Sequence, residues 1–294
     1  MKAAAETVSA RQLLQAAVRR LQAAGKEPAR HEAEWLLSRL LGEPSLALYL
    51  QDPSVSPAVA ERFESQIEAR ASGMPLQYLA GEAEFFGEPF LVRPGVFIPR
   101  PETEAIVEAA LRAFRALAHR LDRPLQLLEL GTGSGCIAVT LARALPACHV
   151  TAVELSWDAL HVAQENILRH EVGARVHLVQ SHWVGSIRGT FDGMVANPPY
   201  VPSAQVARLP FDVRQEPRLS LDGGVSGLRD LLHLLADAPR RLRLGGVLAL
   251  ECGEEQVEPL RQCAAGAAWV LRAEPLHDLA ARPRGMLITR RASP

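Results

Sequence analysis

Cysteine is scarce in this chain of 294 residues, which has only four. They stand at Cys136, Cys148, Cys252 and Cys263, and no two of them form a CxxC pair or the spacing of a zinc site. This excludes a disulfide framework or a zinc ribbon as the basis of the fold. A chain of this length can bury a sizeable core without such crosslinks. We therefore expect four buried, reduced thiols, as in a reducing compartment.

Long hydrophobic runs are also missing, and none approaches the roughly 18 residues that a membrane span needs. The stretch before Leu14 has no continuous hydrophobic segment and contains Glu6, which argues against a secretory signal. We expect a mature, cytoplasmic protein that does not bind membranes.

An excess of basic charge is absent, because 32 Lys and Arg residues face 33 Asp and Glu residues, for a net charge of -1. This excludes a broad surface that coats nucleic acid, although a local basic patch remains possible. Nearly all the basic residues are arginines, and the lysines are Lys2 and Lys26. Arginine suits phosphate and carboxylate contacts, but a compositional bias of the source explains the excess more simply.

Helical periodicity dominates residues 1–75. The first helix is expected after Ser9, a suitable N-cap, and should end near Gly25. A second amphipathic segment follows, and a third begins at Ser56-Pro57. We predict a small helical bundle, which serves for packing or for binding a partner and carries no chemistry.

The pattern changes within residues 76–100. Residues 85–98, FFGEPFLVRPGVFI, contain short β-branched and aromatic runs separated by turn residues, which predicts a β-hairpin linker. Pro101 then opens a helix. From Leu125 to the end, hydrophobic strands alternate with helices, which predicts an α/β fold with a doubly wound, mostly parallel sheet of seven strands in a domain of residues 101–294. Ligands bind such sheets at the carboxyl ends of the strands.

A glycine-rich loop follows the first strand of that sheet. Its residues, which permit a tight turn and a close approach of the backbone to a ligand, are Gly131, Thr132, Gly133, Ser134 and Gly135. The second strand ends at Glu154, whose carboxylate can accept both hydroxyl hydrogens of a ribose. A plain strand–helix turn and a helix-capping acid before Ser156 are the structural alternatives. Together the two motifs resemble class I S-adenosylmethionine-dependent methyltransferases, and an NAD-dependent dehydrogenase remains a competing interpretation at this point.

The fourth strand ends in Asn197, Pro198, Pro199 and Tyr200. Two prolines restrict the backbone after Asn197 and make a stiff platform. The Asn197 side chain and the Pro198 main chain offer carbonyl acceptors for a planar NH2 group, and Tyr200 offers a flat face for stacking. This N-P-P-Y motif resembles that of methyltransferases acting on amide or exocyclic amino nitrogens.

Further motifs narrow the resemblance. Residues 75–81 (PLQYLAG), 85–87 (FFG) and 97–104 (FIPRPETE), with Glu216-Pro217 and residues 221–224 (LDGG) after N-P-P-Y, resemble the peptide chain release factor glutamine N5-methyltransferases (PrmC/HemK family). The likeness covers roughly residues 10–290. It implies a class I methyltransferase fold with a helical substrate-recognition domain. It also implies methylation of the glutamine in the Gly-Gly-Gln loop of class I release factors.

The resemblance also implies the site residues. Gly131 to Gly135 would surround the methionine part of S-adenosylmethionine, Glu154 would hold the ribose, and Trp183 would stack on the adenine. Asn197 would border the cofactor, and Asn197 to Tyr200 would hold the substrate glutamine, with Asn197, Pro198 and Tyr200 as the catalytic set. His182 departs from the family, which usually has Asp there, so it either accepts from the adenine amino group or faces solvent.

The expected reaction yields S-adenosylhomocysteine and needs no metal, because the sulfonium methyl is itself a strong electrophile. We assign no general base. The expected partners are class I release factors, without direct nucleic-acid contact, and the protein is expected to be a monomer. Two alternatives stay open: an adenine-N6 DNA or RNA methyltransferase, which shares the N-P-P-Y logic, and a non-enzymatic protein that retains a cofactor fold.

Overall fold

A computed structural model describes residues 7–292, which pack as two compact units. One unit extends to Gly81 and includes Phe211–Gln215, and the other comprises Glu82–Pro210 and the chain from Glu216 onward. Residues 1–6 and 293–294 lie outside the described residues. The predicted domains 1–75 and 101–294 are therefore described without these residues, and Glu6 is among them.

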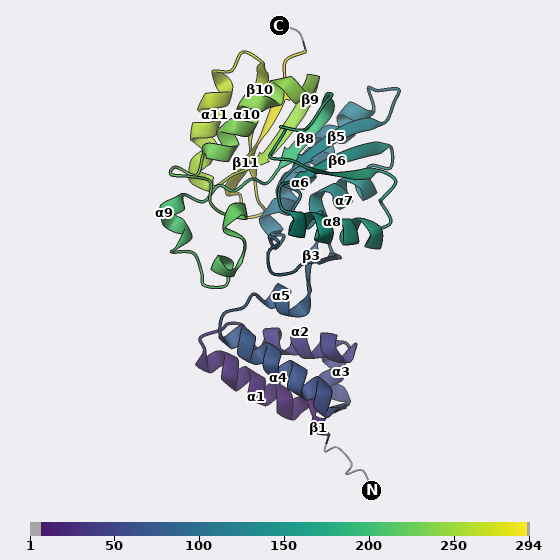
Figure 1. Cartoon of the computed structure of the whole chain (residues 1–294), viewed down its shortest axis with the longest axis vertical. Coiled ribbons are helices and arrows are strands. Elements are labelled where there is room, and N and C mark those ends of the chain that lie inside the picture. The colour runs from purple at the N-terminus through teal and green to yellow at the C-terminus, as the bar shows by residue number, and fades with distance from the viewer. Residues whose placement is uncertain (1–6, 293–294) are drawn as a thin grey trace. The chain divides into compact units, whose positions relative to one another are not determined.

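The first unit is helical, as predicted, and is drawn in purple and blue in Figure 1. Its elements are β1 (Val8–Ser9), α1 (Ala10–Ala23), α2 (Ala29–Leu41), α3 (Ser45–Leu50), β2 (Ser54–Val55), α4 (Pro57–Ala71) and α5 (Leu76–Ala80). The Ser9 side chain accepts a hydrogen bond from the Gln12 amide and so caps α1 as expected. The short elements α3, α5 and the β1–β2 pair were not predicted, because segments of two to six residues are too short to show a period.

A buried ion pair crosses the helical unit. The Arg70 guanidinium donates to both carboxylate oxygens of Glu32 at 2.8 Å, and both side chains are 8% exposed. Arg70 also pairs with Asp212 at 3.4 Å, so the segment Phe211–Gln215 packs with the helices of this unit.

The hairpin lies earlier in the chain than the sequence suggested. Its strands are β3 (Glu82–Phe85) and β4 (Glu88–Leu91), and Phe85 pairs with Glu88 across a two-residue turn. Phe86 and Gly87 both have positive φ, 51° and 72°, which is the geometry of tight hairpin turns. The prediction of a hairpin over 85–98 was therefore wrong in position, because residues 92–100 form no strand.

The second unit contains the seven-stranded sheet, and this prediction is confirmed. Its strands are β5 (Leu125–Leu130), β6 (Cys148–Glu154), β7 (Val176–Gln180), β8 (Phe191–Ala196), β9 (Leu242–Glu251), β10 (Val270–His277) and β11 (Pro283–Arg290). Their order is β10-β11-β9-β8-β5-β6-β7, and β11 runs antiparallel to both of its neighbours while the other pairs are parallel.

Helices cover the two faces of this sheet (Figure 1). One face packs against α6 (Pro101–Ala118), α7 (Cys136–Ala144) and α8 (Trp157–Arg169), and the other against α10 (Arg229–Arg241) and α11 (Val257–Ala265). The connection after β8 holds α9 (Ser203–Val206) and two 3-10 turns, Val213–Gln215 and Arg218–Ser220, and a third 3-10 turn, Glu254–Gln256, follows β9.

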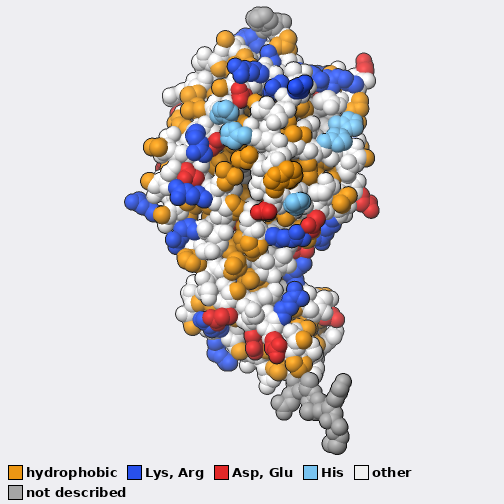
Figure 2. All heavy atoms as spheres, viewed as in Figure 1, with side chains coloured by type: hydrophobic (Ala, Val, Ile, Leu, Met, Phe, Trp, Pro, Cys, Tyr) orange, Lys and Arg blue, Asp and Glu red, His pale blue; other side chains and the backbone are white. Residues whose placement is uncertain are grey.

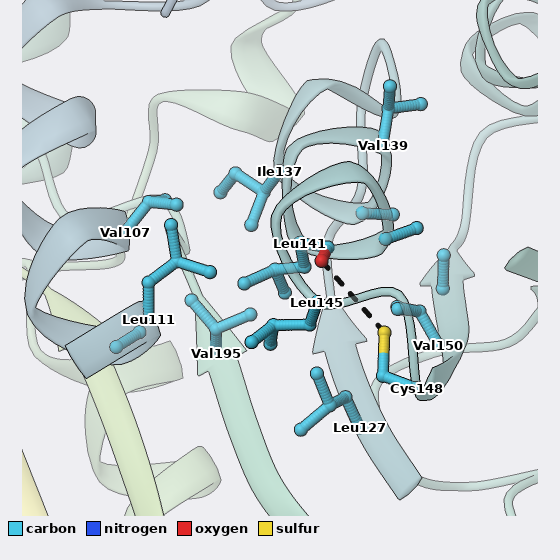
Figure 3. Packing of buried hydrophobic residues seen from close by; sticks show 14 of the residues in the cluster. Val107, Leu111, Leu127, Ile137, Val139, Leu141, Leu145, Cys148, Val150 and Val195 are labelled. Atoms are coloured by element: carbon cyan, nitrogen blue, oxygen red, sulfur yellow. Dashed lines mark hydrogen bonds between the residues drawn. The ribbon is translucent and has the colours of Figure 1, made fainter. Parts of the chain in front are cut away.

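The core on the first face is assembled from α6, α7 and the central strands. Figure 3 shows Leu111, Leu141, Leu145 and Val195 meeting between these elements. Cys148 lies at the edge of this cluster, where its thiol contacts the Leu141 carbonyl oxygen at 3.9 Å. Three cysteines are buried, but Cys263 is exposed near the end of α11, so the expectation of four buried thiols was wrong for that residue.

The sheet order places a switch point between β5 and β8. The chain moves outward from β5 through β6 to β7, then returns to place β8 on the other side of β5. The glycine-rich loop follows β5 and the N-P-P-Y motif follows β8. Because both strands end at the same edge, the two motifs meet where doubly wound sheets bind ligands.

Candidate active site

A cavity of about 420 Å³ opens at the carboxyl ends of β5, β6 and β8. It brings together most of the residues that the sequence singled out: Gly131, Thr132, Gly133, Ser134, Glu154, Trp183, Asn197 and Pro199. Gly135, Pro198 and Tyr200 are not among its lining residues. A cavity of this size suits a nucleoside-sized ligand.

The glycine-rich loop keeps its shape through left-handed backbone at each glycine. Gly131, Gly133 and Gly135 have φ of 78°, 55° and 82°, a region that side chains disfavour. A Cβ on Gly135 would lie 3.2 Å from Ala163 of α8, and one on Gly131 would lie 3.5 Å from the Trp183 ring. The glycines therefore allow close packing behind the loop and an open surface toward the cavity.

Asn166 anchors this loop from α8. Its fully buried side chain donates to the Ser134 carbonyl at 2.8 Å and to the Leu91 carbonyl at 3.0 Å. Its carbonyl oxygen accepts from the Leu91 amide at 2.8 Å, so one amide group joins the hairpin to the glycine-rich loop.

Glu129, on β5, holds the glycine-rich loop through a hydrogen bond with Thr132. Thr132 donates its hydroxyl hydrogen to the Glu129 carboxyl group at 2.6 Å. Burial raises the pKa of Glu129 to about 8, although hydrogen bonds from Thr132 and the Ala138 amide oppose the rise. The group is thus mostly protonated at neutral pH, so no full negative charge is buried beneath the loop.

Glu154 reaches into the cavity and also binds its own backbone surroundings. One carboxylate oxygen accepts from the Gly133 amide at 2.9 Å, and the other accepts from the amides of Leu155 and Ser156 at 2.8 and 2.9 Å. The carboxylate therefore joins the end of β6 to the glycine-rich loop. The capping geometry before Ser156 is therefore present, and the same side chain lines the cavity.

Trp183 forms one wall of the cavity, with its ring beside Gly131. Its indole N–H donates to the buried Asp230 carboxylate at 3.2 Å, and this bond fixes the plane of the ring. His182 also lines the cavity but is exposed, and its ring lies 6.1 Å from that of His233. The structure thus places His182 at the rim, in reach of both solvent and the cavity.

Asn197 is held by a residue from a distant helix. Its Nδ2 group donates to the Thr103 Oγ1 atom at 3.1 Å, and Thr103 is buried in the first turn of α6. Because the NH2 end of the amide is engaged, the carbonyl oxygen Oδ1 is the end left to accept from a ligand in the cavity.

Tyr200 stands behind the cavity wall. Its hydroxyl donates to Glu251 at 3.2 Å, its ring packs against the core on the α10 face, and its main-chain oxygen accepts from Gln256 at 2.8 Å. Burial and the neighbouring Glu251 raise the pKa of Tyr200 above its usual range, so the phenol stays protonated. The structure therefore places Tyr200 as a support of the platform.

The motifs that follow N-P-P-Y in the sequence, Glu216-Pro217 and residues 221–224, hold the loop after Tyr200 in place. Glu216 accepts from the Ile98 amide at 3.0 Å and pairs with Arg100. A Cβ on Gly223 would lie 2.6 Å from the Pro199 oxygen, and one on Gly227 would lie 2.3 Å from the Tyr200 oxygen. Only glycine fits at these two positions, directly against N-P-P-Y.

Five side chains of this site were given no role from the sequence: Thr103, Glu129, Asn166, Asp230 and Glu251. One pattern was available, since Glu129, Glu154 and Glu251 each lie at or next to the carboxyl end of a hydrophobic strand. The pairing of Asn197 with Thr103 spans 94 positions and leaves no local pattern.

The cavity fits S-adenosylmethionine in three respects. It has a glycine loop whose left-handed backbone side chains disfavour, a carboxylate at the end of β6, and an indole face beside them. Among the described residues, no group of three or more His, Cys, Asp or Glu side chains is placed to hold a metal ion. None of the helices within residues 7–292 is long and apolar enough to cross a membrane.

Comparison with known proteins identifies close relatives. Residues 12–81 match the PrmC N-terminal domain family, and residues 109–209 match the methyltransferase small domain family. The release factor glutamine methyltransferase of Moorella thermoacetica is 45% identical over 286 residues, covering 96% of this chain and 98% of that protein. The protein of the same name from Geobacter sulfurreducens is 43% identical over 239 residues, covering 80% of each chain.

Solved structures share the fold at lower identity. A methyltransferase from Pyrococcus furiosus superposes with a TM-score of 0.51 at 21% identity, covering 77% of this chain and 96% of that one. The N-terminal domain of human METTL16 in complex with SAH has a TM-score of 0.51 at 14% identity, covering 83% and 87%. At these identities the likeness concerns the fold alone.

Proposed function

The chain belongs to the release factor glutamine methyltransferase family, and we propose that it methylates the side-chain nitrogen N5 of the glutamine in the Gly-Gly-Gln motif of class I release factors. It has the class I methyltransferase fold and is an S-adenosylmethionine-dependent methyltransferase. Methylation of this glutamine would modulate translation termination.

The observation that carries the proposal is the orientation of the Asn197 amide. Its NH2 end is bound by Thr103, so its carbonyl oxygen is available to accept from the NH2 group of a substrate amide. The Pro198 main-chain carbonyl would supply the second acceptor. Two acceptors side by side would match the two hydrogens of a glutamine amide, although Pro198 itself is not among the residues that line the cavity.

The cofactor supplies an electrophilic methyl group on its sulfonium sulfur. Glu154 would accept from the ribose hydroxyls, Trp183 would pack on the adenine, and Gly131 to Gly135 would border the methionine part. These assignments are supported by the position of the residues around one cavity, with Gly135 behind its wall.

Alignment is the main chemical task of the site. An amide nitrogen is a weak nucleophile because its lone pair is delocalised into the carbonyl, so nitrogen, methyl and sulfur must be held in line. The Asn197 and Pro198 oxygens would orient the NH2 group and stabilise the positive charge that develops on nitrogen. The proton then leaves through a carbonyl acceptor or water, without an assigned general base.

The adenine-N6 alternative is not favoured, because the relatives that match nearly the whole chain are named for glutamine methylation. A nucleic-acid enzyme also calls for a basic surface. On the face drawn in Figure 2, basic side chains gather near the upper end, but over the rest of it acidic and basic side chains are mixed, so this face as a whole is not a broad basic surface. We propose that the protein acts as a cytoplasmic monomer without direct nucleic-acid contact.

A transfer assay tests the proposed function. The protein is incubated with methyl-labelled S-adenosylmethionine and, in parallel, with a class I release factor, adenine-containing DNA or adenine-containing RNA. We expect label on the release factor alone. Label on a nucleic acid, or on none of the substrates, would reject the proposal.

A further inference from the structure

Beneath the N-P-P-Y platform lies a buried polar cluster made of Thr103, Tyr200 and Glu251. Glu251 ends β9 and is 2% exposed, and Thr103 on α6 is 3% exposed. The Glu251 carboxylate accepts a hydrogen bond from the Tyr200 hydroxyl at 3.2 Å, and the nearby Thr103 hydroxyl acts to lower the pKa of Glu251. One acid thus lies beside two residues that contact the platform, Tyr200 and Thr103.

The cluster continues to Asn197. A threonine hydroxyl has one hydrogen to donate and lone pairs with which to accept. The Thr103 oxygen accepts from the Asn197 NH2 group at 3.1 Å, which leaves its hydrogen free to point toward the neighbouring Glu251 carboxylate. When Glu251 is charged it can only accept, and the direction of each bond in this series then follows from it.

We propose that Thr103 and Glu251 are positioning residues, which act through this series of hydrogen bonds to keep the Asn197 carbonyl oxygen turned toward the substrate amide. The inference rests on the proposed function, because it assigns the incoming group as an NH2 donor. With the Asn197 amide reversed, its NH2 would face the NH2 of the substrate, and two donors would oppose each other. Glu251 fixes Tyr200 at the same time, so one buried acid holds both ends of the N-P-P-Y motif.

Three variants separate this role from simple packing. Thr103→Val keeps the shape but removes the hydroxyl, while Thr103→Ser keeps the hydroxyl. Thr140→Val serves as the matched control, because Thr140 is a buried threonine on α7, outside the proposed series. Steady-state methylation of a release factor is measured at pH 8.5, where Glu251, whose pKa burial raises to about 7, is charged.

We expect Thr103→Val to lower kcat by about 10²-fold, the scale of a misplaced reacting group, with the KM for release factor and the affinity for S-adenosylmethionine nearly unchanged. Thr103→Ser should retain most of the activity, and Thr140→Val should match the wild type. Glu251→Gln should also lower kcat, and the double variant with Thr103→Val should lose little more than the worse single variant, because both act in one series.

Nuclear magnetic resonance of the Asn197 side chain gives a readout that needs no substrate. We expect its NH2 hydrogens to exchange slowly with solvent in the wild type and faster in Thr103→Val. Equal exchange in the two proteins, or a raised KM with unchanged kcat, would overturn the positioning role. If the wild type fails to methylate release factor but the exchange difference appears, the proposed function fails while the positioning of Asn197 stands.

Discussion

Asn197 is the residue on which the proposed chemistry depends most. Its amide lies where the carboxyl end of β8 meets the cavity, with one end bound and the other open. We predict that Asn197→Ala abolishes methyl transfer while S-adenosylmethionine binding largely survives, because the amide oxygen serves the accepting nitrogen more than the sulfonium. Single-turnover assays and calorimetry on the same preparation measure the two effects. Methylation near the wild-type rate would show that the platform is assigned wrongly.

Glu154 is the corresponding residue on the cofactor side. Its removal would leave ribose hydroxyls without acceptors and would also release the Gly133 amide that it now binds. We predict that Glu154→Ala weakens S-adenosylmethionine binding by about 1–3 kcal/mol, the usual cost of unpaired polar groups. Glu154→Asp should be mild, since it keeps both acceptors. Unchanged affinity of the alanine variant in calorimetry would leave Glu154 with a capping role only.

Much of the site could be predicted from the sequence, but only where its residues form a continuous motif. The glycine-rich loop and N-P-P-Y are each continuous in sequence and follow recognisable strands, so their meeting at one sheet edge could be predicted. The partner of Asn197 could not be predicted, because Thr103 belongs to a helix 94 residues away. The backbone contacts of Glu154 were equally hidden, since both ribose binding and capping suit an acid in that position.

At the scale of elements, the amino end of β8 carries a charged cluster remote from the cavity. Asp192 accepts two bonds from Arg123 at 2.7 Å and one from Arg243 at 2.9 Å. Burial acts to raise the pKa of Asp192, but these bonds and one from the Gln126 amide outweigh it and hold the pKa at about 2. The cluster thus joins β8 to the segment that precedes β5 and to the first residues of β9.

This depressed pKa makes a prediction about stability. The folded-state pKa lies below the ordinary value of 3.8, so the contribution is present above about pH 4 and is lost as the pH falls toward 2. We predict that Asp192→Asn lowers the free energy of unfolding by about 2 kcal/mol at pH 7. Urea titrations of both proteins at pH 7 and at pH 2 measure the difference. A gap of the same size at both pH values would contradict the linkage.

Elements with a strong period were predicted well, and those without one were not. The seven strands of the sheet each have a hydrophobic run, and the structure contains all of them. The hairpin was misplaced because its turn consists of Phe86 and Gly87 alone, and Pro89, a residue typical of turns, lies within β4. A proline is tolerated there because this sheet has only two strands.

At the scale of the whole molecule, the proposed function gives the two units different roles: the sheet unit binds the cofactor, and the helical unit recognises the release factor. The described lining of the cavity belongs to the sheet unit, and the helical unit contributes none of it. We predict that deleting residues 1–75 leaves S-adenosylmethionine binding near normal. Methylation of an intact release factor should fall more than methylation of a short Gly-Gly-Gln peptide.

Comparing the two substrates shows whether the deleted helices recognise the release factor or only support folding. A larger loss on the intact protein indicates that the helical unit recognises parts of the release factor beyond the glutamine. An equal loss on both substrates would indicate that the helices only support folding, and would remove the recognition role proposed for them.

The most direct test of the central claim is the position of the methyl group. A class I release factor treated with this protein and S-adenosylmethionine is digested, and the Gly-Gly-Gln peptide is fragmented in a mass spectrometer. We predict one added methyl group on the glutamine side-chain nitrogen with the wild type, and none with Asn197→Ala. A methyl group on another residue, or an unmodified peptide after treatment with active wild-type protein, would contradict the account.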